Sequence, residues 1–332
     1  MKIVLSEDVF KISTTDDAWK LHKLLTFSCE GRHTIACTSP VLLEEWLSQI
    51  DAPTASAYRT AVNLSGRNSA VLPYNSATVF IKDTHSPVWN DPEAELSIDD
   101  ALKLLKEPLG ILLENSENDL FFLLGIMRPS ERARMKRAIE NRWAIPVHGG
   151  GSNIVAQLNK RLSQEFVGLR TFVLFDSDRR HSAELDLNWA PQSSESCQGY
   201  IVETVVRPKL PMRFWMLARR FIESYMPKSV LVKAPSQAGT PAAIEAFFRL
   251  SEHGRWFFNM KKGFNGDLAH ENRHRSRDLY DGIDPEDKVQ LENGFGSGLA
   301  NLFGGAVENE FEWDNEALRE ASEKIPNLMR LL

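Results

Sequence analysis

The sequence is poor in cysteine and has no long apolar run, and both absences restrict what the protein can be. Its three cysteines, Cys29, Cys37 and Cys197, form no even disulfide framework and no Cys-x-x-Cys pair. This usage favours a reducing compartment, the cytoplasm, and disfavours a zinc site. The longest apolar runs, such as residues 120–124, are far shorter than the roughly 20 residues of a membrane-spanning helix. Residues 1–7 lack the pattern of a signal peptide, so we expect neither export nor a membrane partner.

The composition is that of an ordinary globular protein. The chain has 332 residues, of which 42% are hydrophobic and 25% charged, and such a chain buries a sizeable core. This length favours two domains, or one domain with large additions. The sequence contains no Gly-x-x-x-x-Gly-Lys-[Ser/Thr] phosphate loop and no His-Glu-x-x-His spacing. Neither a P-loop ATPase nor a histidine metal centre is therefore indicated.

Charge is distributed unevenly along the chain. Residues 1–107 hold 10 basic and 15 acidic side chains, residues 108–277 hold 25 and 17, and residues 278–332 hold 4 and 13. A basic middle between acidic ends is typical of a nucleic-acid channel on an acidic body, although solvated faces give the same fluctuation. The basic side chains concentrate in residues 128–142, 207–233 and 272–277. Side chains of this kind position a phosphate backbone without reading its sequence.

Strand-like and helix-like segments alternate, which indicates an α/β protein. We expect an N-terminal α/β lobe over residues 1–107, a central domain over 108–265 and a helical C-terminal extension over 266–332. In the central domain, β runs at residues 110–113, 143–147 and 171–175 are separated by helical segments. This rhythm predicts a Rossmann-like parallel sheet flanked by helices. We also expect helices over residues 211–226 and 314–332.

Polar side chains stand where the strands of the predicted central sheet end. Glu114 follows the first β run, the glycine-rich residues 148–153 (HGGGSN) follow the second, and Asp176 and Asp178 follow the third. Ligands bind outside the carboxyl ends of parallel strands, so these groups are expected to share one crevice. Carboxylates are ligands for Mg²⁺, and glycines before a helix let the backbone approach a phosphate. Taken singly, each also has a simpler interpretation as a loop, cap, first-turn or tight-turn residue.

The combination of these motifs resembles the TOPRIM domain, the catalytic fold of topoisomerases, DnaG-type primases and OLD-family nucleases. The motifs are Glu114 in LLENSENDLFFL, the segment HGGGSN, and Asp176 with Asp178 in VLFDSDRR. The family commonly has Glu-Gly after the first strand and an aspartate four residues after the glutamate. This chain has Asn115 instead of the glycine, and Asp119 lies five residues after Glu114.

Two later segments resemble the OLD-like, defence-associated branch of these nucleases. The segment WMLARRFIESYMP carries Arg220, Glu223 and Tyr225, and the segment FFNMKKGF carries Lys261. The resemblance covers residues 108–265, about half of the chain. Taken without it, Glu223 is equally well placed to pair with a neighbouring arginine on a solvated helix face, and Lys261 to be a surface lysine.

The resemblance implies a metal-dependent endonuclease that cleaves DNA, or else RNA. Cleavage of a phosphodiester by two metal ions requires several carboxylates, and a lysine can stabilise the developing charge. The implied ligands of two Mg²⁺ or Mn²⁺ ions are Glu114, Asp176, Asp178 and Glu223, with Lys261 as a further catalytic residue. The phosphate-binding candidates are Gly149, Gly150, Gly151, Ser152, Arg219, Arg220 and Lys262.

Several roles remain open at this point. OLD-like proteins often serve in anti-phage defence, and because this chain lacks an ATPase motif, an ATPase or another defence protein is a candidate partner. The alternatives are a non-catalytic or partner-activated sensor and a primase- or topoisomerase-like enzyme. In the N-terminal lobe, Asp8, Glu44 and Glu45 resemble the acids of a PIN-like nuclease, while a specificity or partner-binding lobe is the other interpretation. The acidic C-terminal helix is expected to dock on the body, to cover the site or to form a homodimer.

Overall fold

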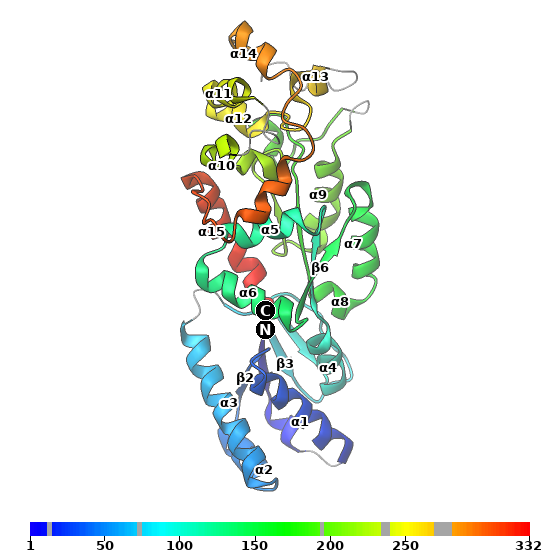
Figure 1. Cartoon of the computed structure of the whole chain (residues 1–332). Coiled ribbons are helices and arrows are strands. Elements are labelled where there is room, and N and C mark those ends of the chain that lie inside the picture. The colour runs from blue at the N-terminus through cyan, green and yellow to red at the C-terminus, as the bar shows by residue number, and fades with distance from the viewer. Residues whose placement is uncertain (12–14, 72–74, 193–195, 234–239, 269–280) are drawn as a thin grey trace.

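The computed structural model describes residues 1–11, 15–71, 75–192, 196–233, 240–268 and 281–332. The predicted basic segment at residues 272–277 lies outside this description. The described chain is an α/β protein with two four-stranded sheets, both entirely parallel and both flanked by helices. Figure 1 shows the first sheet toward one end of the molecule, a group of helices at the other end, and both termini near the middle.

The first sheet has the strand order β2-β1-β3-β4. Its strands are β1 (Lys2–Leu5), β2 (Thr34–Cys37), β3 (Thr78–Ile81) and β4 (Glu93–Leu96). Its helices are α1 (Thr15–Cys29), α2 (Pro40–Leu47), α3 (Ala52–Val71) and α4 (Ile98–Lys106). Ser39 and Ser97 cap α2 and α4 by accepting hydrogen bonds from backbone N–H groups in the first turn.

The second sheet has the strand order β6-β5-β7-β8. Its strands are β5 (Leu109–Leu113), β6 (Ala144–His148), β7 (Thr171–Phe175) and β8 (Phe214–Met216). The helices that connect them are α5 (Asn118–Ile126), α6 (Pro129–Glu140), α7 (Ile154–Leu162), α8 (Glu165–Leu169) and α9 (Gln198–Lys209). The predicted central sheet is therefore confirmed as a Rossmann-like arrangement of parallel strands and helices.

Both sheets share one topology, in which the first strand of the unit lies between the second and the third. In such a sheet the connections leave the first strand in opposite directions, and ligands bind at the carboxyl edge beside that switch point. In the second sheet the switch point lies at β5 and β7, so the residues that follow these two strands stand beside it.

The second sheet is covered on both faces. Along β5, Ile111 and Leu113 belong to an apolar core that continues into the first sheet, while Leu112 belongs to a second core on the opposite face. The helices α7 and α9 supply Leu158 and Val206 to that second core. Strands buried on both faces read as continuous apolar runs, which is why β5 and β7 are visible in the sequence.

The helix predicted over residues 211–226 is wrong. This segment forms β8, which pairs in parallel with β7, and then a loop and the 3₁₀ turn Ile222–Tyr225. Its apolar side chains suit a helical period, but along the strand they alternate between two cores. Trp215 and Leu217 belong to the core that continues into the first sheet, and Phe214 belongs to the core on the opposite face. The strand is only three residues long, too short for its period to be recognised.

The remaining helices follow β8. They are α10 (Lys228–Lys233), α11 (Pro241–Arg249), α12 (Glu252–Phe257), α13 (Gly263–Leu268), α14 (Pro285–Gln290) and α15 (Asn315–Met329). The expected C-terminal helix is confirmed as α15, and it docks on the body because Ala321, Ile325 and Leu328 are buried in the shared core. Leu318, also expected on its apolar face, is 45% exposed. In the described ranges, no helix combines the length and apolar character needed to cross a bilayer.

Candidate active site

Glu114 and Asp176 lie side by side at the carboxyl edge of the second sheet. Glu114 follows β5 and Asp176 follows β7, and these two strands are neighbours. The backbone N–H of Asp176 donates to Oε1 of Glu114 at 3.1 Å. The two acids therefore lie close together at this edge, as their positions after neighbouring strands predict.

Asp178 lies two residues further along the same loop and is held by helix α9. Its backbone φ of 54° is in the left-handed region, and its Oδ2 accepts a hydrogen bond from the N–H of Gly199 at 2.9 Å. A Cβ atom at Gly199 would lie only 2.1 Å from the carbonyl oxygen of Ser177. Glycine is therefore required here for α9 to approach the loop that carries the two aspartates.

Glu223 enters the site from the 3₁₀ turn after β8. Its side chain is 1% exposed, and its Oε1 lies 3.4 Å from Nζ of Lys261. Its Oε2 is buried and has no hydrogen-bond partner among the described residues. The preceding N–H of Ile222 donates to Oδ1 of Asp176 at 3.0 Å. Glu223 thus pairs with Lys261, not with Arg219 or Arg220, and its turn is bonded directly to Asp176.

Asp119 belongs to the same cluster, which the sequence did not establish. It lies in the first turn of α5, is 6% exposed, and its Oδ2 accepts from the N–H of Asn115 at 2.9 Å. The negative charge of Glu223 acts on it directly. Its spacing of five residues from Glu114 departs from the family pattern, yet its side chain bonds to the backbone of Asn115, the residue after Glu114.

Crowding of these acids in a buried place changes their protonation. Burial, followed by the charges of Asp178 and Asp119, raises the pKa of Glu114 to about 8. Burial also raises the pKa of Asp119 to about 7, and it raises the pKa of Asp176 well above its ordinary value, where Glu114 adds to the effect. A set of buried carboxylates with raised pKa values holds protons or attracts cations.

Lys261 supplies positive charge to this cluster. Burial disfavours its ammonium group, but the carboxylates of Glu223, Asp176 and Glu114 outweigh burial and raise its pKa above the ordinary lysine value. The loop that carries it is held by the glycine-rich segment after α14, because the N–H of Phe295 donates to the carbonyl of Met260 at 2.7 Å. Lys262, the neighbouring candidate, is exposed.

The donors of this cluster suit a hard divalent cation, but the side chains are not gathered around one point. In the part of the chain that the structure describes, no group of three or more His, Cys, Asp or Glu side chains is arranged to hold a metal ion. Glu114, Asp176 and Asp178 instead accept backbone N–H groups. The carboxylate donors and the unpartnered Oε2 of Glu223 are of the chemical type that Mg²⁺ or Mn²⁺ prefers. Because the donors are not gathered around one point, the two-metal site stays a prediction.

The glycine turn after β6 adjoins Glu114. The N–H of Gly149 donates to the carbonyl of Leu113 at 2.6 Å, and the N–H of Gly150 donates to the carbonyl of Glu114 at 3.2 Å. Gly150 and Gly151 both have positive φ. Because the N–H groups of Gly149 and Gly150 already have acceptors, these two residues build the turn and are not free to bind a phosphate. The side chain of Ser152 lies outside the described part of the structure.

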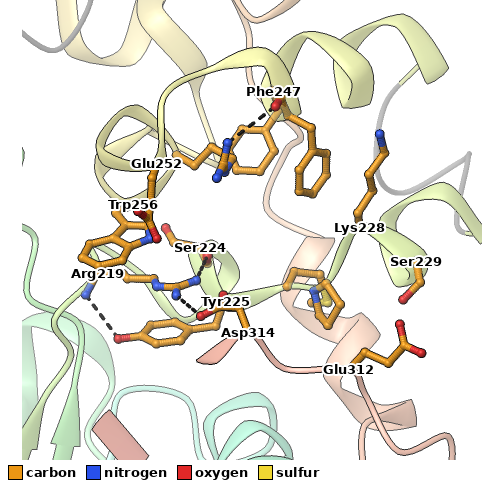
Figure 2. A pocket seen from close by; sticks show the side chains of 14 residues that line it. Arg219, Ser224, Tyr225, Lys228, Ser229, Phe247, Glu252, Trp256, Glu312 and Asp314 are labelled. Atoms are coloured by element: carbon orange, nitrogen blue, oxygen red, sulfur yellow. Dashed lines mark hydrogen bonds and ion pairs between the residues drawn. The ribbon is translucent and has the colours of Figure 1, made fainter. Parts of the chain in front are cut away.

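The two arginines proposed to bind phosphate are engaged inside the protein. Arg220 makes a buried bidentate ion pair with Asp267, with both N–O distances at 2.7 Å. Figure 2 shows Arg219 between the rings of Tyr225 and Trp256, where it donates to the carbonyl of Ser224 at 3.0 Å and to Asp314 at 2.6 Å. These contacts fix the loop that carries Glu223, so both arginines position the site instead of contacting a phosphate directly.

The first sheet also has a pocket at its carboxyl edge. Asp8 lines it together with Lys82 and Asp83. Glu44 lies elsewhere and pairs with Arg59. Of the acids that resemble those of a PIN-like nuclease, Asp8 thus lines this pocket and Glu44 does not.

No family model, no curated protein and no solved structure matches this chain.

Proposed function

We propose that this protein is a metal-dependent nuclease of the TOPRIM type, with DNA as its favoured substrate. The observation that supports the proposal best is the cluster of half-buried Glu114 and Asp176 with buried Glu223 and with Lys261 at the switch point of the second sheet. Glu114 and Asp176 come from neighbouring strands, and Glu223 and Lys261 come from segments far apart in the sequence. A purely structural ion pair would not require so many acids in one buried place.

The residues of this cluster divide into two roles. Glu114, Asp119, Asp176, Asp178 and Glu223 would hold Mg²⁺ or Mn²⁺, which would supply an activated water and charge stabilisation for phosphodiester cleavage. Lys261 keeps its proton among these acids and presents its ammonium to the phosphate that is cleaved. Its side chain is 41% exposed while that of Glu223 is 1% exposed. A substrate therefore meets Lys261 first, with the carboxylates behind it.

A partner-activated form of the same enzyme is the second candidate. The observation that favours it is that the carboxylates accept backbone N–H groups and are not gathered for a metal ion. A defence protein or an ATPase that shifts the loop after β7 would release Asp176 and Asp178 toward one point. Anti-phage defence is implied only by the resemblance to OLD-like proteins.

Cleavage of supercoiled plasmid in Mn²⁺ tests the proposal. Wild type is compared with Glu114→Gln and Asp176→Asn, and with Glu117→Gln as the matched control, because Glu117 is an exposed acid only three residues from Glu114. We expect nicking by wild type and by Glu117→Gln, and a loss of at least about a hundredfold in the other two. Equal nicking by all four proteins would show a contaminating nuclease. Cleavage of single-stranded RNA alone would reassign the substrate.

A further inference from the structure

Asp267 is a buried carboxylate that contacts three segments from distant parts of the chain. It lies in α13 and is 0% exposed. Its Oδ2 and Oδ1 accept hydrogen bonds from Nη1 and Nη2 of Arg220, both at 2.7 Å. Its Oδ1 also accepts from Nδ2 of Asn259 at 3.2 Å and lies 3.6 Å from Nη2 of Arg180. Donors from three segments therefore converge on one carboxylate group.

Each partner of Asp267 lies two or three residues from a residue of the candidate active site. The pairs are Arg180 with Asp178, Arg220 with Glu223, and Asn259 with Lys261. The first partner follows β7, the second follows β8, and the third lies between α12 and α13. Because these segments are far apart in the sequence, tertiary contacts have to set their relative positions.

The main chain at Arg220 joins two of the same segments. Its carbonyl accepts from the N–H of Asp178 at 3.2 Å, and its N–H donates to the carbonyl of Trp256 at 3.0 Å. Its Nη1 also donates to the carbonyl of Phe257 at 3.2 Å. The main chain of Arg220 thus connects the aspartate loop to α12, and its side chain connects both to α13.

Asn259 connects Asp267 to the loop that carries Lys261. Its Nδ2 donates to Asp267, and its Oδ1 accepts from the N–H of Lys262 at 3.0 Å. A Cβ atom at Gly266 would lie 2.4 Å from Cβ of Lys262 and 2.8 Å from Nδ2 of Asn259. Glycine therefore lets α13 lie directly against this loop.

We propose that Asp267 is a positioning residue, which holds Lys261 beside the carboxylate of Glu223. Removing two charges from water offsets much of their attraction, so apolar residues of similar volume would hold these segments together as well. A carboxylate that accepts several charge-assisted hydrogen bonds also fixes the directions of its donors. The inference rests on the proposed function, because positioning matters only if Lys261 takes part in cleavage.

The nuclear magnetic resonance signal of Lys261 tests its placement without any assay of cleavage. Lysines are dimethylated with isotopically labelled formaldehyde, which keeps their positive charge, and the signal missing from Lys261→Arg is that of Lys261. The first variant is Asp267→Asn, whose amide nitrogen cannot accept from Arg220 as Oδ2 does. We expect the chemical shift of the Lys261 signal to change in this variant, because its ammonium group leaves the carboxylate of Glu223.

Asn259→Leu is the second variant, and Asp287→Asn is the matched control. The leucine keeps the branched shape of Asn259 but removes both hydrogen bonds between Asp267 and the lysine loop. Asp287 makes a similar ion pair with Arg249, with Nε and Oδ2 3.0 Å apart. That pair joins α14 to α11, two helices that carry no residue of the candidate site. We expect a changed Lys261 signal in Asn259→Leu and the wild-type signal in Asp287→Asn.

Cleavage of supercoiled plasmid in Mn²⁺ provides the second readout. A small displacement of a catalytic group is costly, so kcat per folded protein should fall by roughly ten- to a hundredfold in Asp267→Asn and Asn259→Leu. Asp287→Asn should keep the wild-type kcat. Absence of cleavage by wild type would refute the proposed function, whereas the Lys261 signal would still show whether Asp267 places this lysine.

Several results would overturn the proposal. One is an unchanged Lys261 signal in either variant when it is folded, and another is an equal change in Asp287→Asn. A changed signal with an unchanged kcat would also overturn it, because Lys261 would then need no positioning. If Asp267→Asn does not fold, Asn259→Leu decides. Failure of both variants to fold would assign these contacts to general stability and would overturn the proposal as well.

Discussion

The ammonium of Lys261 lies 3.4 Å from Oε1 of Glu223, whose other carboxylate oxygen is buried without a partner. The two residues come from different segments, the turn after β8 and the loop between α12 and α13. Their pairing brings the helical end of the molecule to the carboxyl edge of the second sheet. Lys261 also lies over the ring of Phe221 at 5.0 Å, so packing as well as charge places it there.

Replacement of Lys261 by methionine should reduce nuclease activity. The methionine keeps most of the length of the side chain but removes the charge that faces the substrate phosphate. We expect the cleavage rate to fall by roughly two orders of magnitude, measured on supercoiled plasmid in Mn²⁺. Lys262→Met is the control, since Lys262 is the exposed neighbour, and it should keep its rate within about twofold. Equal rates for the two variants would remove Lys261 from the catalytic set.

Helix α15 should stabilise the segment that carries Glu223. Oε1 of Glu320 accepts from Nε1 of Trp215 at 2.7 Å and from the N–H of Ala218 at 2.8 Å, and Oε2 accepts from the hydroxyl of Tyr225 at 2.6 Å. Glu320→Ala leaves three donors without an acceptor and should lower the free energy of unfolding by about 3 kcal/mol.

Glu320→Gln should cost only about 1 kcal/mol, because the amide oxygen can replace Oε1 and the amide nitrogen can donate to the Tyr225 hydroxyl. Urea unfolding measures the free energy of unfolding of wild type, Glu320→Ala and Glu320→Gln. Glu323→Ala changes an exposed acid of the same helix and should leave stability unchanged. If Glu320→Ala unfolds at the wild-type midpoint, the helix does not anchor this segment.

Two glycine substitutions should have opposite effects on stability. A methyl group at Gly199 would lie 2.1 Å from the Ser177 carbonyl oxygen, whereas one at Gly66, inside α3, would meet nothing within 4 Å. Gly199→Ala should therefore destabilise the protein by about 3 kcal/mol, and Gly66→Ala should stabilise it by about 0.5–1 kcal/mol. Thermal unfolding checks both, and a harmless Gly199→Ala would contradict the close approach of α9 to the aspartate loop.

His33 should make the protein less stable in mild acid. It is 3% exposed, and its Nε2 bonds to the carbonyl of Leu105 at 3.0 Å. Burial, with the charges of the amino group of Met1 and of Arg170 adding to it, lowers its pKa well below the ordinary value. In the unfolded chain the imidazole of His33 takes up a proton near pH 6.5, whereas in the folded chain it stays neutral at that pH. Between pH 7.5 and 5.5 the loss of stability from this residue is about 1.4 kcal/mol.

Urea unfolding of wild type and His33→Gln at both pH values isolates this contribution, because the raised pKa values of the carboxylate cluster affect both proteins equally. Wild type should lose about 1.4 kcal/mol more than the variant. His85→Gln, at an exposed histidine, should behave like wild type. A wild-type loss that matches that of His33→Gln would show that His33 is protonated in the fold.

The parts of the fold that follow a simple period could be predicted from the sequence. The strands at Thr78–Ile81 and Thr171–Phe175 are compact β-branched and aromatic runs, and α4 has a serine cap with acids in its first turn. Helix α3, which packs on the first sheet, and strand β4 of that sheet lack a sequence pattern of this strength. The α3 sequence APTASAYRTAVNLSGRNSAV consists mostly of small and polar residues. β4 reads EAEL; it alternates polar and apolar residues over only four positions, and glutamate and alanine are not typical of strands.

Some residues of the candidate site could likewise be predicted from the sequence, and others could not. Glu114, Asp176 and Asp178 follow predicted strands, so topology alone places them at one edge. Glu223 and Lys261 could be named only through the family resemblance, because tertiary packing brings them to that edge. The sequence does not single out Asp119, because its burial near Glu223 depends on how α5 packs. The ion pair between Arg220 and Asp267 has no signal in the sequence.

Direct measurement of Mn²⁺ binding tests the central claim, that the carboxylate cluster is a metal centre. Electron paramagnetic resonance measures the concentration of free Mn²⁺ during a titration of the folded 332-residue chain. The account predicts saturable binding of two ions by wild type and by Glu117→Gln, and loss of at least one ion in Glu114→Gln and Asp176→Asn. Absence of saturable binding by folded wild type at millimolar Mn²⁺, or equal binding by all four proteins, would contradict it.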